Sequence, residues 1–145
     1  MYQKEPNYWL ALSGGLSYLF SAYVASKFGS RSAVISSLGL ALTSIWFHTT
    51  RDDTSFWTDQ ALVGAFGIMS IKEAWERGPI ELGMVINGML NAVLFFHIGQ
   101  MGNCYTYSPD VATATAYHAT IHMGSAVVLS SVLAGSNVLL LTDLR

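Results

Sequence analysis

Long apolar blocks alternate with short polar segments along the whole chain. Each block ends at glycine, proline or charged residues, as helices do. A helix needs about 20 mostly apolar residues to cross a bilayer. The pattern therefore predicts an all-α, multi-pass transmembrane bundle of about five spans. We expect these spans at residues 7–28, 33–49, 56–71, 80–98 and 111–141.

The last of these blocks is longer than a bilayer requires. Residues 111–141 contain no acid and no lysine or arginine. At about 1.5 Å per residue this helix would measure roughly 46 Å, whereas the hydrocarbon core of a bilayer is about 30 Å thick. We expect the helix to tilt, to kink near Gly124 or Gly135, or to project beyond the membrane.

The composition of the chain supports a membrane protein and argues against nucleic-acid binding and an internal disulfide. Charged residues make up 11% of the chain, against about 25% in an average globular domain. The formal net charge is −2 and no basic run occurs, so we expect no nucleic-acid partner. A single cysteine, Cys104, excludes an internal disulfide. We expect residues 1–145 to form one domain.

The cationic residues indicate how such a bundle would be oriented. Five spans place the two termini on opposite sides of the membrane. The basic residues of one side are Lys27, Arg31, Lys72, Arg77 and Arg145, and those of the other are Lys4 and Arg51. Cytoplasmic loops carry the excess of lysine and arginine. The N-terminus is therefore expected on the non-cytosolic side. The sequence does not indicate which membrane holds the protein.

Histidines gather toward the membrane face that carries the N-terminus. His48 lies near the end of the second predicted helix, and His97 near the end of the fourth. His118 and His122 lie in the first half of the last helix. Asp59 lies near the start of the third helix, on the same side. Ionisable groups within membrane helices are costly and are usually functional.

This arrangement favours a zinc site. His118 and His122 are four residues apart and point off one helix face, and His48 can supply a third ligand from a neighbouring helix. Catalytic zinc usually has three protein ligands and one open position, and it lowers the pKa of a bound water to about 7. We expect Asp59 to act as the general base and the Ser44 hydroxyl to lie beside the ion.

The order and spacing of these residues resemble a known signature. Ser44-x3-His48 near the end of the second span, Asp59 in the third, and His118-x3-His122 in the last resemble the CREST superfamily of membrane hydrolases. That superfamily includes alkaline ceramidases and adiponectin/progestin-type receptors. The resemblance implies zinc on His48, His118 and His122, and hydrolysis of an amide bond in a lipid such as ceramide. Members usually have seven spans, whereas this chain has about five.

Other interpretations stay open at the level of sequence. Two histidines on different helices can ligate haem or a pigment, with His48 or His97 paired with His118 or His122. The chain can also be a structural subunit without chemistry, or its histidines can be packing residues. The partners we expect are membrane lipid, a lipid substrate, and further copies or subunits in a membrane complex.

Overall fold

A computed structural model describes the backbone of residues 5–142 and the side chains of residues 5–135. The described chain is helical and contains no strand, which confirms the all-α prediction. Its main helices are α1 (Tyr8–Lys27), α2 (Arg31–Thr50), α3 (Asp53–Arg77), α4 (Pro79–Val93) and α6 (Val111–Thr142). A π-helical turn (Leu94–Ile98) and the short α5 (Gly99–Gly102) extend α4, and a 3-10 turn (Tyr105–Tyr107) precedes α6.

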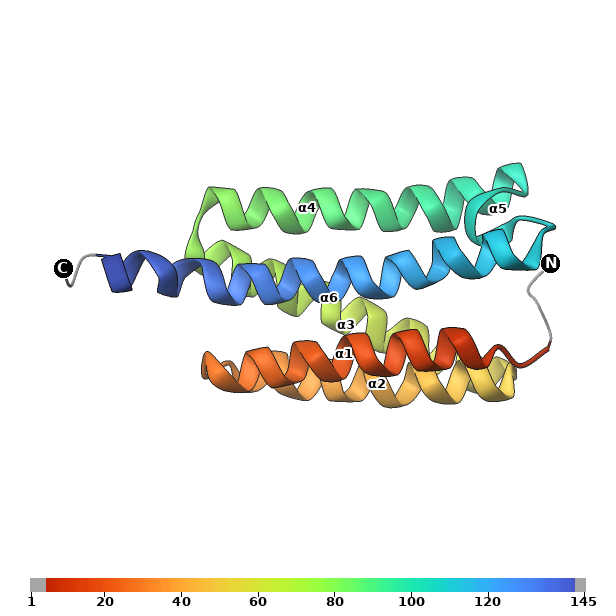
Figure 1. The fold of residues 1–145 in the computed structure, drawn as a ribbon, viewed down its shortest axis with the longest axis horizontal. Helices are drawn as coiled ribbons and strands as arrows, with labels where there is room; N and C mark the ends of the chain where they lie inside the picture. Colours follow the sequence, from red (N-terminus) through yellow and green to blue (C-terminus); the bar gives the residue numbers. More distant parts are fainter. Residues whose placement is uncertain (1–4, 143–145) are drawn as a thin grey trace.

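The helices lie roughly side by side along one long axis, and α6 runs through the middle of the bundle (Figure 1). Helix α6 packs against α1, α3 and α4, while α1 pairs with α2 and α2 with α3. The described ends of the chain lie at opposite ends of the bundle (Figure 1). Leu129 and Leu133 of α6 are fully buried in the main core, together with Leu40 of α2.

Small residues bring α1 and α2 together. The buried face of α1 includes Gly14 and Gly15, and that of α2 includes Ala41 and Ser44. A Cβ placed on Gly15 would lie 2.8 Å from the end of the Ile45 side chain, so a larger residue here would force that side chain to move. Close packing through small residues is typical of helix pairs in membranes.

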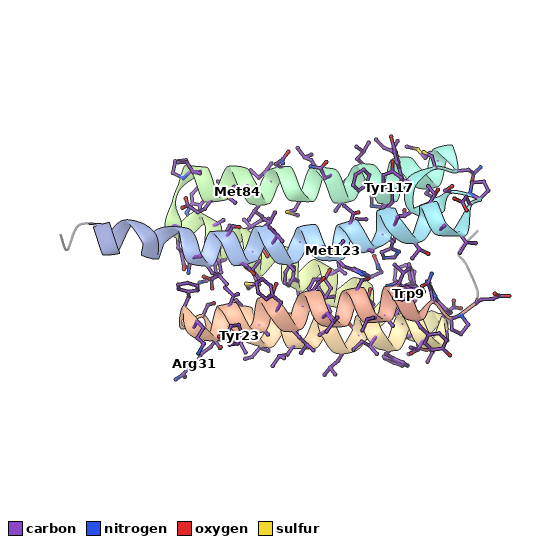
Figure 2. All side chains as sticks on the ribbon, viewed as in Figure 1. Trp9, Tyr23, Arg31, Met84, Tyr117 and Met123 are labelled. Atoms are coloured by element: carbon purple, nitrogen blue, oxygen red, sulfur yellow. The ribbon has the colours of Figure 1, made fainter. Side chains whose placement is uncertain are left out.

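Three helices are long and apolar enough to cross a membrane. They are α2, the continuous helical stretch Pro79–Gly102, and α6 over Val111–Gly135. Large apolar side chains also cover the outside of the bundle, as Trp9 and Tyr23 do on α1 (Figure 2). Soluble monomeric proteins rarely expose apolar side chains over a large contiguous area. The fold is therefore that of a membrane protein.

Helix α6 is one unbroken helix from Val111 to Thr142. Its hydrogen-bonded course continues through Gly124 and Gly135 without a break. Its C-terminal end projects beyond the neighbouring ends of the other helices (Figure 1). The length predicted from the sequence is thus present in one helix, and its tilt or projection relative to a bilayer stays a prediction.

Candidate metal centre

His48, His118 and His122 converge inside the bundle. One ligand atom from each ring lies within 4.8 Å of the others. The ring centroids are 4.8 Å apart for His48 and His118, 4.8 Å for His118 and His122, and 5.2 Å for His48 and His122. The three residues that the spacing in the sequence placed in one site thus do meet, and they are able to hold a metal ion.

Two helices supply these rings. His48 lies in the last turn of α2, which ends at Arg51 in the left-handed conformation. His118 and His122 lie two and three turns into α6 and share one face because they are four residues apart. The antiparallel course of the helices brings the end of α2 level with the early turns of α6.

Buried polar atoms without partners mark the centre of this cluster. Both ring nitrogens of His48 and the hydroxyl of Ser44 are buried and lack a hydrogen-bond partner among the described residues. An unpaired polar group in an apolar interior costs about 1–3 kcal/mol. Two free nitrogens on a ring that is 1% exposed therefore fit a residue that holds a ligand.

The separations fit one ion with imidazole ligands. Zinc–nitrogen bonds are about 2.0–2.1 Å long, so nitrogens on one zinc lie at most roughly 4 Å apart. The ligand atoms of His48, His118 and His122 lie within 4.8 Å of one another, so small ring rotations would bring them onto one ion. A haem would instead need two histidines on opposite faces of a flat macrocycle, and the direct ring contacts among these three histidines do not favour that arrangement.

Asp59 of α3 is buried beside the cluster. Its exposed fraction is 6%, and its Oδ1 accepts a hydrogen bond of 3.1 Å from the Thr43 hydroxyl. Thr43 precedes Ser44 on α2, so consecutive residues of one helix orient the carboxylate and present the unpaired hydroxyl. Asp59 and Ser44, both predicted as site residues, line the same cavity as His118 and His122.

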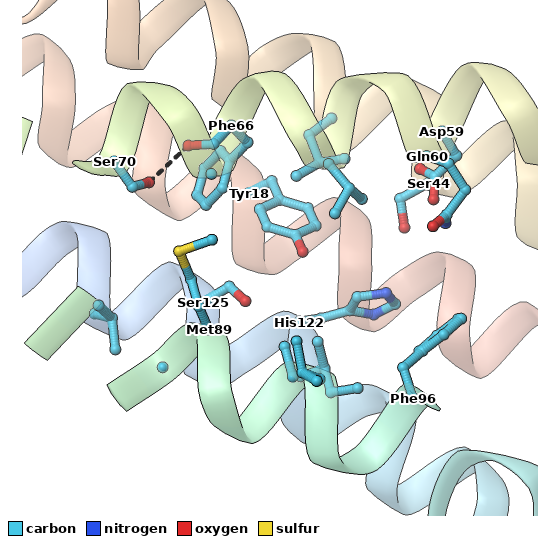
Figure 3. Close-up of a pocket in the computed structure, with 18 of the residues that line it drawn as sticks. Tyr18, Ser44, Asp59, Gln60, Phe66, Ser70, Met89, Phe96, His122 and Ser125 are labelled. Carbon is cyan, nitrogen blue, oxygen red and sulfur yellow. Dashed lines mark hydrogen bonds between the residues drawn. The ribbon is translucent and has the colours of Figure 1, made fainter. Parts of the chain in front are cut away.

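That cavity has a volume of about 260 Å³ and mostly apolar walls. In Figure 3, Ser44, Asp59 and Gln60 lie across it from His122. Away from the histidines its walls are Phe66, Gly67, Val85, Met89 and Val128. Ser44, Asp59 and Gln60 therefore lie toward one end of a mostly apolar cavity, and Ser70 lines it further away.

Residues of α1 belong to this site, although the sequence pattern did not single them out. The Ser13 hydroxyl lies 3.1 Å from Nδ1 of His122. The Tyr18 ring meets the His122 ring edge-on, with centroids 5.8 Å apart, and Tyr18 lines the cavity. Serine and tyrosine are common in membrane helices, so neither residue carries a signal until α1 is placed against α6.

His97 lies on the π-helical turn that continues α4. It lines the cavity but is not part of the three-histidine cluster. Phe96, its neighbour, packs edge-on against His118 with centroids 5.5 Å apart. The turn also leaves the Phe95 carbonyl free to accept a 2.6 Å hydrogen bond from the Thr106 hydroxyl. Single π turns often occur at functional sites.

Two exposed carboxylates lie at the N-termini of α3 and α6, at the end of the bundle that holds the histidines. Asp52 caps α3 and Asp110 caps α6, each by accepting hydrogen bonds from the first turn of its helix. The bond from the Ser55 backbone N–H lowers the pKa of Asp52. The hydrogen bond from the Thr113 hydroxyl is the main cause of the lowered pKa of Asp110. Both caps are thus held in the charged form.

Comparison with known proteins returns no match of the chain to a family model, to a curated protein or to a solved structure.

Proposed function

We propose that this chain is a zinc-dependent integral membrane hydrolase that cleaves an amide or ester bond in a lipid such as ceramide. The observation that carries the proposal is the convergence of His48, His118 and His122, of which His118 and His122 line a mostly apolar cavity. The arrangement agrees with the resemblance to the CREST superfamily, whose signature uses the same residue types in the same order.

Three neutral imidazoles suit zinc, and a site with three protein ligands keeps a position open. When bound there, zinc supplies a Lewis acid that acidifies water and polarises a carbonyl group. His48 contributes from α2, and His118 and His122 contribute from α6. The fit rests on the two unpaired nitrogens of His48 and on the size of the triangle.

Asp59 is the proton acceptor in this proposal. Its Oδ1 accepts a hydrogen bond from Thr43, while its other carboxylate oxygen accepts none from the described residues. A general base must lie within hydrogen-bond reach of the proton it removes, and Asp59 lines the cavity with two of the zinc ligands. Ser44 offers its unpaired hydroxyl as a donor to the carbonyl oxygen of the amide or ester group that is cleaved.

A lipid substrate is supported by the walls of the cavity and by its place in the bundle. Val63 of α3 and Met89 and Val93 of α4 line the cavity, and each is at least 41% exposed. This exposure supports an opening of the cavity at the surface between α3 and α4. In a bilayer that surface faces hydrocarbon, so an acyl chain enters without crossing water.

We further propose that all five main helices cross the membrane. Helices α1 and α3 are not among the three candidate spans, but their outer faces also carry large apolar side chains. On α1 these faces carry Leu12, Leu16 and Phe20, and on α3 they carry Ile68 and Trp75, each at least half exposed. Residues with this exposure are expected to contact lipid.

Metal analysis of the detergent-purified protein tests the centre directly. We expect about one zinc per chain, and His118→Ala should lose both the zinc and hydrolysis of a ceramide-containing micelle. His97→Ala is the matched control, because His97 lines the same cavity outside the cluster, and it should keep the zinc. Wild-type protein that takes up no zinc from a metal-supplemented buffer would refute the proposal.

A further inference from the structure

Helix α1 contributes no ligand to the cluster, yet it forms the wall against which His122 rests. A Cβ on Gly14 would lie 3.2 Å from Cε1 of His122 and 2.2 Å from the Ser44 hydroxyl. The absence of a side chain at Gly14 therefore lets the α1 backbone approach both residues. Ser13, the preceding residue, meets the same imidazole at its Nδ1 edge.

The Ser13 hydroxyl makes two contacts, and its single hydrogen can serve only one of them. It donates to the backbone carbonyl of Leu10 at 3.1 Å. The second contact is to Nδ1 of His122, also at 3.1 Å. A hydroxyl has one donor hydrogen and two acceptor lone pairs. With its hydrogen given to Leu10, Ser13 accepts from Nδ1–H.

This assignment fixes the form of the imidazole. In a neutral histidine one ring nitrogen carries the hydrogen and the other holds the lone pair that binds metal. If Nδ1 donates to Ser13, the lone pair of His122 is on Nε2. If the Ser13 hydroxyl turned to donate to Nδ1 instead, Nε2 would carry the hydrogen and His122 could not bind the ion through it.

We propose that Ser13 is a positioning residue that holds His122 as the Nδ1–H tautomer, so that Nε2 binds the metal. The inference rests on the proposed metal site. The hydrogen bond from a ligand's second nitrogen commonly sets its tautomer and ring orientation, and losing such a partner typically weakens metal binding 10- to 100-fold. Ser13 is thus a determinant of affinity that touches neither ion nor substrate.

The N-terminal end of α1 is fixed so that Ser13 keeps this position. The Asn7 backbone N–H donates to the His48 carbonyl at 2.8 Å. The Asn7 side-chain amide donates to the Thr115 hydroxyl at 2.8 Å, and its oxygen caps α1 by accepting from the Leu10 N–H. Asn7 therefore ties α1 to both of the helices that carry the histidines.

Zinc titration of purified apo-protein in detergent tests the role of Ser13. We expect Ser13→Ala to weaken zinc binding by roughly 10- to 100-fold. Ser13→Thr should restore most of the affinity, because a threonine hydroxyl in a helix also bonds to a carbonyl of the preceding turn. Ser17→Ala is the matched control, since Ser17 lies one turn further along α1, and it should bind as wild type.

Nitrogen-15 spectra of the histidine rings in the zinc-free protein read the tautomer without any metal. We expect the His122 ring to be protonated at Nδ1 in wild type and in Ser13→Thr, and to become a mixture of tautomers in Ser13→Ala. A His122 ring protonated at Nε2 in wild type, or zinc affinity unchanged in Ser13→Ala, would overturn the inference. Wild type that binds no zinc at all would instead refute the metal site itself.

Discussion

The arrangement of the site depends on Gly14, because glycine has no side chain beyond its hydrogen. At this position the α1 backbone passes so close to α2 and α6 that a methyl group would overlap the Ser44 hydroxyl. Interiors are close-packed and yield little to added volume. The close approach therefore sets the positions of Ser44 and His122 together, from a helix that supplies no ligand.

We expect Gly14→Ala to lower the free energy of unfolding by about 1–3 kcal/mol, the usual cost of overpacking, and to weaken zinc binding. Thermal unfolding in detergent and zinc titration measure the two effects. Gly64→Ala is the matched control, because a Cβ at Gly64 of α3 would meet nothing within 4 Å. If Gly14→Ala behaves like Gly64→Ala in both assays, the close contact does not constrain the site.

At the scale of single helices, a network of polar side chains holds the end of the bundle opposite the histidines. Glu73 near the end of α3 is 5% exposed. It accepts hydrogen bonds from Ser30, which caps α2, and from Arg77 of its own helix. Ser32 also donates to it, at 3.2 Å. The network therefore joins the start of α2 to the end of α3.

Glu73 lies beyond the apolar part of α3 and gives the fold a pH dependence. Burial pushes the pKa of Glu73 upward, but the hydrogen bonds from Ser30 and Arg77 outweigh it and leave this pKa below its ordinary value. A carboxyl whose pKa is lowered by folding stabilises the fold above its unfolded-state pKa, and that stability is lost as pH falls through the folded-state pKa.

We therefore expect thermal stability to fall on acidification below about pH 4.5, near the ordinary pKa of glutamate. Glu73→Gln should be less stable than wild type at neutral pH and should lose less stability on acidification. Unfolding curves recorded across this pH range provide the measurement. Glu76→Gln is a suitable control, because Glu76 pairs with Lys72 on the exposed surface. Equal acid sensitivity of wild type and Glu73→Gln would contradict this role.

The sequence predicted the helices well, because apolar blocks bounded by glycine and charge leave few alternatives in a membrane. It also brought His48, His118 and His122 together, since a four-residue spacing places two histidines on one helix face. It did not predict Ser13 or Gly14, whose roles depend on how closely α1 approaches α6. Nor did it predict the π-helical turn at Leu94–Ile98, because the spacing of apolar residues does not distinguish such a turn from an α-helix.

At the scale of the whole molecule, the number of membrane crossings determines where the site opens. The bundle has five main helices, and its described ends point in opposite directions (Figure 1). If all five cross the bilayer, the site lies toward the side that carries the N-terminus. Lys27, Arg31, Lys72 and Arg77 then lie toward the other side.

Reporter fusions at each end of the chain test this arrangement. We expect a reporter at the C-terminus to lie in the cytosol and one at the N-terminus to lie on the opposite side, following the excess of cationic residues on cytoplasmic loops. Reversing the charge of Lys72 and Arg77 together should weaken this preference. Reporters that lie on the same side of the membrane would show an even number of crossings and would contradict five spans.

The opening of the cavity between α3 and α4 has a consequence for how reaction rates would be expressed. Met89 and Val93 line the cavity and are each at least 41% exposed, so under the proposed function a lipid in the cavity would exchange with the surrounding bilayer. The fraction of protein that holds substrate then depends on the mole fraction of substrate in the bilayer. Adding inert lipid at constant total substrate should slow turnover by dilution in two dimensions, while adding buffer should leave it unchanged.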